Sequence, residues 1–239
     1  MEKLLKIPYT VFNNDWDLLQ QFLKRRGNPR YEIVGDVDLS YKKDIFDLGN
    51  LVRVYGDLNL SFSSVQSLGN LQYVDGPLDL RGTSIKSLGN LEHIGGNLNL
   101  FGTPIQSLEN LQYVGGNLNL FGTAIQSLGN LQYVGWSLAL YNTTIKSLGN
   151  LKYVGGALNL TETPIQSLGN LVRVGGNLIL SDTPIRSLGN LEYVGGYLDL
   201  RDTSIQLFGN LEYVGDTIYL SKNHQMPEEQ LTKFKIEYI

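Results

Sequence analysis

The side chains that could do acid–base or metal chemistry are few and far apart in this sequence. His93 and His224 are the only histidines, and cysteine is absent. The repeat described below separates these two histidines by more than six turns of the chain, roughly 30 Å at the spacing of stacked strands. A histidine metal site, an acid–base pair and a Ser–His–Asp triad are therefore not expected. The sequence predicts no catalytic residue, no cofactor site and no metal site.

One group of carboxylates recurs at a fixed spacing. Glu162, Asp182 and Asp202 occupy the same position in three consecutive repeats. Like charges on adjacent strands repel each other, so something must offset them. We favour neutralisation at an exposed strand end, where charged side chains are usually solvated, by neighbouring basic residues: Arg186, Arg201 and Lys222. The alternative is a glycan-binding protein, or a carboxylate-based enzyme acting on polysaccharides, that uses this strip.

Composition restricts the class of protein. The 239 residues carry a formal net charge of −4, which argues against nucleic-acid binding because that function needs a basic surface. No stretch is long and apolar enough to cross a membrane, and the start "MEKLLKIPYTVFNNDWD" lacks the apolar run of a signal peptide. The absence of cysteine fits a reducing compartment. We expect a soluble, intracellular (cytoplasmic) protein of cellular or viral origin.

A unit of 20 residues repeats from about residue 31 to residue 223, for example "LNLTETPIQSLGNLVRVGGN" from Leu158. Two leucines spaced by two indicate a short strand with both side chains on one face. "SLGN" predicts a tight turn, and "NLVRVGG" predicts a second extended piece that ends at a glycine pair with positive φ. Each unit is then one coil of a single elongated domain. The predicted fold class is an all-β, right-handed solenoid of about ten coils.

Several polar and aromatic residues recur at the same position of each repeat, and we expect them to stabilise the coil. The asparagines from Asn50 to Asn210 stand between leucines, so we expect a buried ladder of hydrogen-bonded amides. The serines from Ser67 to Ser187 are expected to cap the "SLGN" turn. The threonines from Thr83 to Thr203 end the first strand, and Thr143 to Thr203 with their neighbours are candidates for a hydroxyl ladder. The tyrosines from Tyr73 to Tyr213 are expected to stack in register.

The repeat resembles a known family. A unit of about 20 residues with L-x-L in a strand is similar to leucine-rich repeats. The phrase "NLQYVGGNLNL" from Asn110 looks closest to the receptor L-domain branch, although the cysteine modules of those receptors are missing. The resemblance covers about four-fifths of the chain. It implies a right-handed β-helix of leucine-rich type and a function in binding other macromolecules.

Both ends are expected to cover the open ends of the solenoid. Residues 1–30 form the predicted N-terminal cap, with a helix that begins at Asn14 or Asp15 and ends at Gly27. Its apolar face, expected over the first coil, consists of Trp16, Leu19, Phe22 and Leu23. Residues 224–239 form the predicted C-terminal cap, in which a helix starting at Pro227 precedes a strand. That strand is expected to bury Phe234, Ile236 and Tyr238.

The positions of the repeat whose residue type changes from coil to coil indicate where recognition takes place. They fall at positions 57, 59 and 61 and at every twentieth residue after these, on the outward side of the first strand. The third of these columns places Phe101, Phe121 and Tyr141 in neighbouring coils, with Arg81 and Arg201 further out. An aromatic row with a polar rim is typical of an interface, and aromatic and arginine side chains contribute most binding energy.

The predicted function is a non-catalytic scaffold, of adaptor or inhibitor type, that binds a protein partner through this face. Association of the chain with itself and a purely structural ladder stay open as alternatives. The predicted contact residues in addition to the row and the two arginines are Asn99, Asn119, Trp136, Ile179, Tyr197 and Tyr219.

Overall fold

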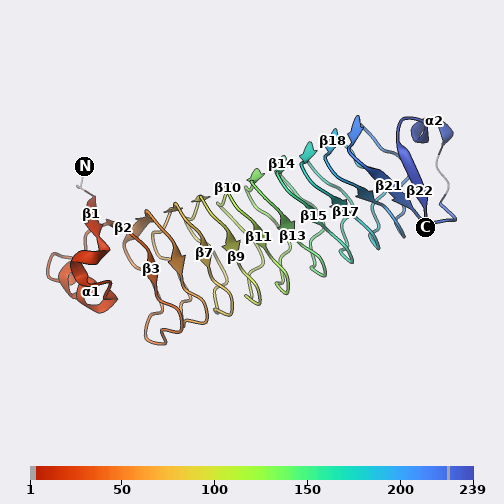
Figure 1. Ribbon diagram of the computed structural model, residues 1–239. Helices are drawn as coiled ribbons and strands as arrows, with labels where there is room; N and C mark the ends of the chain where they lie inside the picture. Colours follow the sequence, from red (N-terminus) through yellow and green to blue (C-terminus); the bar gives the residue numbers. More distant parts are fainter. Residues whose placement is uncertain (1–3, 225–226) are drawn as a thin grey trace.

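The protein is a parallel β-solenoid (Figure 1). The computed structural model describes residues 4–224 and 227–239. The chain winds through about ten coils, and each coil adds one strand to each of two parallel, eleven-stranded sheets. Partners in neighbouring regular coils are 20 residues apart, as in the pairs Leu118–Leu138 and Tyr113–Tyr133. The predicted all-β solenoid of about ten coils is confirmed.

Sheet A carries the second extended piece of each coil. Its strands, in spatial order, are β1 (Leu5–Pro8), β2 (Tyr31–Val34), β4 (Leu51–Val54), β6 (Tyr73–Val74), β8 (His93–Ile94), β10 (Tyr113–Val114), β12 (Tyr133–Val134), β14 (Tyr153–Val154), β16 (Arg173–Val174), β18 (Tyr193–Val194) and β20 (Tyr213–Val214).

Sheet B carries the L-x-L strands. Its strands, in spatial order, are β3 (Val37–Asp38), β5 (Leu58–Asn59), β7 (Leu78–Asp79), β9 (Leu98–Asn99), β11 (Leu118–Asn119), β13 (Leu138–Ala139), β15 (Leu158–Asn159), β17 (Leu178–Ile179), β19 (Leu198–Asp199), β21 (Thr217–Leu220) and β22 (Lys235–Tyr238).

One apolar core runs along the whole solenoid. In every regular coil the same six positions point inward, because the two-residue period of the strands and the looser spacing of the turns bring them to one side. In the coil that starts at Leu158 each of these side chains is at most 2% exposed: Leu158, Leu160, Ile165, Leu168, Leu171 and Val174. The apolar positions of the repeat were therefore predicted correctly.

The glycine pair at the end of sheet A has a different role from the predicted one. Neither glycine of the pairs at 115–116 and 155–156 adopts a positive φ. Instead, a Cβ atom on Gly155 would overlap the carbonyl group of Gly135 in the preceding coil. The pair is needed because adjacent backbones approach closely, and the expectation of a positive-φ turn there is wrong. The glycine of "SLGN" supplies that conformation, as Gly129 does at φ 58°.

The serine and threonine columns close turns within their own coils. Ser127 Oγ accepts a hydrogen bond from the backbone N–H of Gly129 at 3.0 Å, and the same bond recurs through the column. This confirms the predicted cap. Thr123 Oγ1 donates to the carbonyl of Leu120 at 2.6 Å, again in a recurring pattern. The threonine hydroxyls are therefore committed to their own backbone and do not form the ladder between coils that was considered.

The asparagine column lies at the surface, which corrects the expectation that it is enclosed between two leucines. Its members from Asn90 to Asn210 are exposed, because the turn carries them away from the core. A bond between two amides of the column joins Asn70 Nδ2 to Asn50 Oδ1 at 2.8 Å. Asn110 Nδ2 donates instead to a backbone carbonyl of the preceding coil.

Amide side chains do link successive coils in another column, just before the strands of sheet B. Asn97 Oδ1 accepts the backbone N–H of Asn117 at 2.7 Å, and Asn117 Oδ1 accepts the backbone N–H of Ser137 at 3.0 Å. These bonds satisfy backbone donors at the corner between the two sheets.

The tyrosines of sheet A stack in register, as predicted. The ring centroids of Tyr113 and Tyr133 are 4.8 Å apart with the planes 1° from parallel, and His93 stacks on Tyr113 at 4.4 Å. At the interruption by Arg173, the guanidinium carbon lies 3.6 Å from the centroid of Tyr193. We call this stack the tyrosine column.

The N-terminal cap contains the predicted helix, and also a strand that was not predicted. The helix α1 (Trp16–Lys24) starts after Asp15, whose carboxylate accepts the N–H groups of Asp17 and Leu18. The strand β1 precedes a short 3-10 helix η1 (Tyr9–Phe12) and pairs in parallel with β2, so it extends sheet A at this end. Lys6 and Pro8 are exposed along it.

The C-terminal cap adds its strand to the other sheet. The helix α2 (Glu228–Leu231) is followed by β22, which pairs in parallel with β21 at the end of sheet B (Figure 1). Phe234 and Ile236 are partly buried, whereas Tyr238 is 44% exposed, so its predicted burial is wrong. Among the described residues, β22 is the last strand of sheet B at this end. No helix among the described residues is long and apolar enough to span a membrane.

Candidate functional site

The predicted aromatic row exists on the outer face of sheet B. Phe101, Phe121 and Tyr141 each follow a strand of sheet B, at the turn where the chain leaves the sheet. Centroid distances are 5.6 Å between Phe101 and Phe121 and 4.5 Å between Phe121 and Tyr141, with the planes 21° and 19° apart. Phe101 is 44% exposed and Tyr141 is 36% exposed. The three side chains form one continuous aromatic surface, which we call the aromatic row.

The turn beside the aromatic row requires a left-handed backbone. Gly102, Gly122 and Asn142 follow the three aromatic residues, with φ values of 68°, 70° and 54°. Glycine and asparagine adopt this conformation at low cost. Small side chains therefore border the aromatic row. We call the aromatic-row column and this left-handed column together the rim of sheet B.

Two of the predicted contact residues hold the rim in place. Asn99 Oδ1 accepts the backbone N–H of Phe101 at 3.1 Å, and Asn119 Oδ1 accepts that of Phe121 at the same distance. Such a bond from a residue two positions earlier fixes the turn. These asparagines therefore position the aromatic residues, and they have a structural reason to be present.

The two arginines of the rim are bound within their own coils. Arg81 forms an ion pair with Asp79 at 2.7 Å, and Arg201 forms one with Asp199 at 2.6 Å. The carboxylate of Asp199 is almost completely buried and also accepts the backbone N–H of Arg201. The hydrogen bonds to Asp199 raise the pKa of the Arg201 guanidinium.

The acidic strip is part of the left-handed column. Glu162, Asp182 and Asp202 have φ values of 56°, 59° and 53° and are exposed. Aspartate tolerates this conformation, which explains two of the three acidic residues without a ligand. Arg201 pairs with Asp199, so the expected neutralisation of the strip by Arg201 does not occur through an ion pair.

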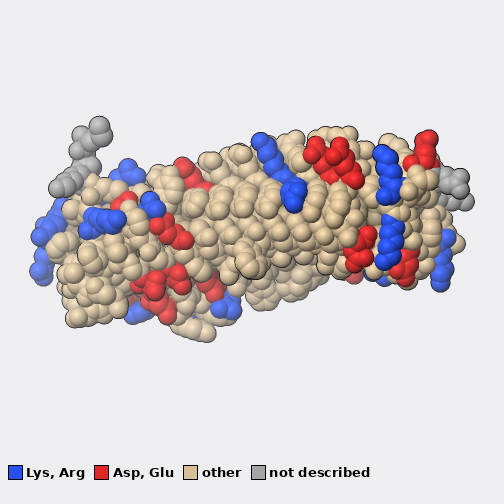
Figure 2. Space-filling view, turned by 45° about the horizontal axis from the view of Figure 1, so that its top comes forward, with Lys and Arg blue, Asp and Glu red and all other residues tan. Residues whose placement is uncertain are grey.

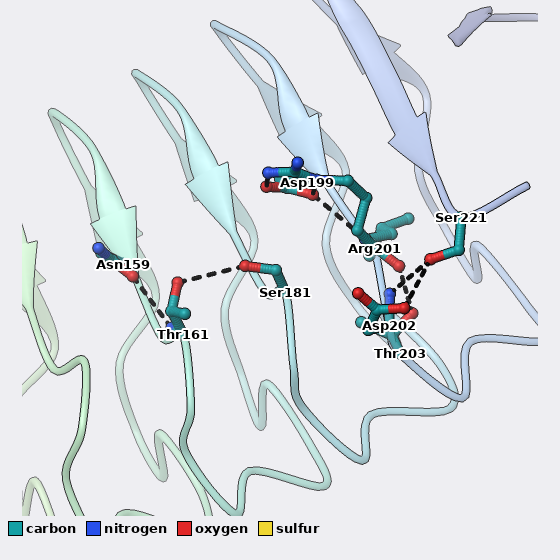
Figure 3. A network of polar contacts seen from close by, with 9 residues as sticks. Asn159, Thr161, Ser181, Asp199, Arg201, Asp202, Thr203 and Ser221 are labelled. Carbon is teal, nitrogen blue, oxygen red and sulfur yellow. Dashed lines mark hydrogen bonds and ion pairs between the residues drawn. The ribbon is translucent and has the colours of Figure 1, made fainter. Parts of the chain in front are cut away.

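Hydroxyl groups surround the strip. Ser221 Oγ donates to Asp202 Oδ1 at 3.0 Å, and Thr161 Oγ1 lies 3.4 Å from Ser181 Oγ (Figure 3). Among the described residues, no group of three or more histidine or carboxylate side chains is placed to hold a metal ion. The two histidines lie apart, His93 within the tyrosine column and His224 after the last coil.

The remaining predicted contact residues lie away from the aromatic row. Trp136 is 66% exposed, but it precedes β13 whereas Tyr141 follows it, so the two rings lie at opposite ends of this strand. Tyr197 and Tyr219 form an edge-to-face pair at 5.7 Å near the end of sheet B. Ile179 is partly buried on β17, which pairs with β19. The structure therefore divides the predicted surface into separate patches.

Two aromatic residues of the rim were missed at the sequence level. Tyr41 is 67% exposed and Phe62 is 40% exposed, and their rings stack at 5.3 Å. They occupy the left-handed column, with φ values of 59° and 55°, where other coils have glycine, asparagine or an acidic residue. That substitution was the available signal. For Tyr41 it was obscured because the first coil has one additional residue, which shifts the pairing to Val37–Leu58, whereas Phe62 keeps the regular spacing.

The aromatic row lies in a section of the molecule with few charges. In residues 94–161 the charged side chains are Glu109, Lys146 and Lys152. Figure 2 shows the acidic side chains gathered toward the two ends of the solenoid, with a largely uncharged band between them. Such a surface favours contact with an apolar or aromatic partner over the binding of an ion.

A comparison with models of known protein families, with curated proteins and with solved structures finds no match.

Proposed function

We propose that this protein is a non-catalytic scaffold that binds a macromolecular partner, most simply a protein, through the exposed face of sheet B. The observation that carries the proposal is the aromatic row. Three stacked rings stand at the surface in the middle of the solenoid, although the same column holds Ser61, Thr161 and Ser181 in other coils. A column that served the stack alone would have no reason to be aromatic in only these coils.

Rigidity supports the proposal. The aromatic residues follow strands that are paired on both sides, and asparagine bonds hold two of the three turns. A surface that is ordered before binding loses less conformational entropy when the partner arrives. Aromatic side chains at the centre of an uncharged patch are the usual anchors of protein interfaces.

Finer assignments belong to the same proposal. We place the chain near the leucine-rich repeats, on the L-x-L strands and the phrase "NLQYVGGNLNL", and in the cytoplasm, on the absence of cysteine. We propose no cofactor and no nucleic-acid partner. The glycan-binding or polysaccharide-acting alternative has less support, because the left-handed turn accounts for aspartate in the acidic strip.

The test is capture of partners by the wild type and by the triple variant Phe101→Ser/Phe121→Ser/Tyr141→Ser. The matched control is Gln106→Ser/Gln126→Ser/Gln166→Ser, which changes three exposed side chains on the turn side of the coils of Phe101, Phe121 and Thr161. All three proteins must first show equal thermal unfolding. We expect a macromolecule captured by the wild type and the control to be lost by the aromatic variant. Equal capture by all three would disprove the role of the aromatic row.

A further inference from the structure

We infer that the partner of this face is a second copy of the chain, bound antiparallel, with the two-fold axis passing through the coil of Phe121. This inference rests on the proposed function, because it identifies the occupant of the same surface. It follows from the arrangement of side chains along the rim of sheet B on either side of the aromatic row.

The aromatic row is symmetric about Phe121. One coil before it stands Phe101, and one coil after it stands Tyr141. An interface with a two-fold axis is self-complementary. If the axis passes through the coil of Phe121, a residue that lies a given number of coils before this coil faces the residue of the second copy that lies the same number of coils after it. Phe121 then meets its own copy, and Phe101 meets Tyr141 of the second copy. Gly102 and Gly122 leave no side chain that would hold the two surfaces apart.

The charges of the rim are arranged to match under this symmetry. Two coils from the axis, Arg81 comes opposite Glu162 of the second copy. Three and four coils from the axis, the turn with Lys42 and Lys43 comes opposite Asp182 and Asp202. All six side chains are exposed at the surface. Lys43 Nζ is held at the carbonyl of Phe62, three coils before the axis, by a 2.6 Å hydrogen bond.

The pairing also accounts for two features of the rim. The three like charges of the acidic strip repel each other within one molecule, and opposing basic side chains relieve that repulsion. The exposed ring of Tyr41, four coils before the axis, comes opposite Arg201 of the second copy, whose guanidinium can stack on an aromatic face. The acidic residues in this stretch do not cancel the match, because Asp79 is already paired with Arg81 and Asp44 is one carboxylate beside two lysines.

A head-to-tail assembly fits the structure less well. Lys6 and Pro8 lie on the outer strand β1, and Lys235 lies on the outer strand β22. Charged residues and proline on an edge strand oppose the addition of a further strand. The lateral contact is narrow, and we therefore expect weak, concentration-dependent association at the low end of specific interfaces.

Sedimentation velocity from about 1 µM to about 200 µM tests whether the dimer forms. We expect a shift from monomer to dimer in the wild type and at least a tenfold weaker association for Phe121→Ser. The control Gln126→Ser, on the turn side of the same coil, should associate like the wild type. A monomer at every concentration would overturn the inference.

Charge exchange tests the register. Lys43→Asp and Asp182→Lys each place like charges opposite each other, so each should weaken association several-fold. The double variant restores opposite charges across the interface and should recover association to within about twofold of the wild type, because one chain carries both changes. Failure of the double variant to recover would exclude this register.

Spin-label distances test the orientation, because the chain has no cysteine and accepts a single label at any exposed site. Labels at Gln126, Gln66 and Gln206 lie none, three and four coils from the axis. In the antiparallel dimer the two copies of a label are separated along the solenoid axis by twice their distance from the two-fold axis, at about 4.8 Å per coil. This separation is close to zero for Gln126, about 29 Å for Gln66 and about 38 Å for Gln206. Equal distances at all three sites would mean a parallel pair and would overturn the inference.

These outcomes separate the inference from the proposed function. If the wild type stays monomeric while the triple aromatic variant still loses a captured macromolecule, the second copy is excluded and the scaffold function stands. If the wild type stays monomeric and capture does not depend on the aromatic row, both fail.

Discussion

The two outer faces of this solenoid carry aromatic stacks that follow the same 20-residue repeat, yet the stacks differ in what surrounds them. On sheet A, the tyrosine column runs along most of the molecule and lies against glycine. A Cβ atom on Gly115 would be 3.3 Å from Cε1 of Tyr113. On sheet B, the aromatic row spans three coils and projects from a turn. The comparison teaches that an aromatic column supports the fold where its neighbours are fixed, and is available for binding where they vary.

The largest expected effect concerns the glycines beneath the tyrosine column. Gly155→Val should lower the free energy of unfolding by about 4 kcal/mol, because the new side chain overlaps the Gly135 carbonyl and separates two coils. Gly102→Asn is the matched change on the rim, where a Cβ meets nothing within 4 Å and the left-handed turn accepts asparagine. It should cost less than about 1 kcal/mol. Urea unfolding measures both, and similar losses would remove the distinction between the two faces.

The second prediction compares two arginines of the rim. Arg201→Ala leaves the carboxylate of Asp199, 5% exposed, without its ion pair and should cost about 2 to 3 kcal/mol. Arg81→Ala leaves Asp79, whose side chain is 21% exposed and better hydrated, and should cost about 0.5 kcal/mol. Thermal and urea unfolding of both variants would show the difference. A larger loss of stability for Arg81→Ala than for Arg201→Ala would mean that the ion pair with Asp199 does not stabilise the fold more than the ion pair with Asp79.

The third prediction exchanges one ring on each face. Tyr113 stacks on two neighbours and is partly buried, so Tyr113→Ser should lower stability by about 1 to 2 kcal/mol. Phe101 stacks on one neighbour and is 44% exposed, so Phe101→Ser should change stability by less than about 0.5 kcal/mol. Equal losses would indicate that the aromatic row serves the fold as much as the tyrosine column does.

The smallest expected effect concerns a tyrosine on the inside of the molecule. Tyr9 is 1% exposed, and its hydroxyl has no hydrogen-bond partner among the described residues. Burial, with a smaller contribution from Asp15 and Asp17, raises the pKa of Tyr9 from 10.0 to about 12. Because the folded protein holds this proton more tightly than the unfolded chain, stability is unaffected below about pH 10 and falls as the pH rises toward 12.

Tyr9→Phe should therefore stabilise the protein by about 0.5 to 1 kcal/mol at neutral pH and reduce the alkaline loss. Urea unfolding near pH 7 and near pH 11 measures both effects. The control is Tyr213→Phe, which removes a hydroxyl from a tyrosine-column side chain that is 48% exposed, so the alkaline loss of the wild type should persist. A destabilised Tyr9→Phe protein would mean that the hydroxyl has a partner after all.

Much of the fold followed from periodicity, because residues such as Leu158 and Leu160 recur with spacings that only one side of a coil can satisfy. Periodicity could not show why a particular residue type recurs at a given position of the repeat. From the sequence alone, the glycine pair at 155–156 is equally compatible with a positive φ and with the close approach of two backbones. Only the distance between neighbouring coils decides between these two roles. The strand β1 was missed because it stands outside the repeat.

The candidate site was predicted in part for a similar reason. Alternation along the strand placed Phe101, Phe121 and Tyr141 on one outer face, and the structure has them stacked. Trp136 could not be located from spacing, since five residues can bring a ring to the same patch or to the far end of a strand. Tyr41 was missed because one additional residue in the first coil hides its column.

The opposite placement of the terminal strands has a consequence for how such a molecule changes in length. Sheet A has its additional strand at the N-terminal end, and sheet B has its own at the C-terminal end. The two caps are therefore not interchangeable, and whole units can be added or removed only between them. Duplication or deletion of one interior 20-residue unit would alter the distance between the caps by a step of about 4.8 Å. The length of the solenoid is thus set in discrete steps by the number of interior coils, while the two caps stay the same.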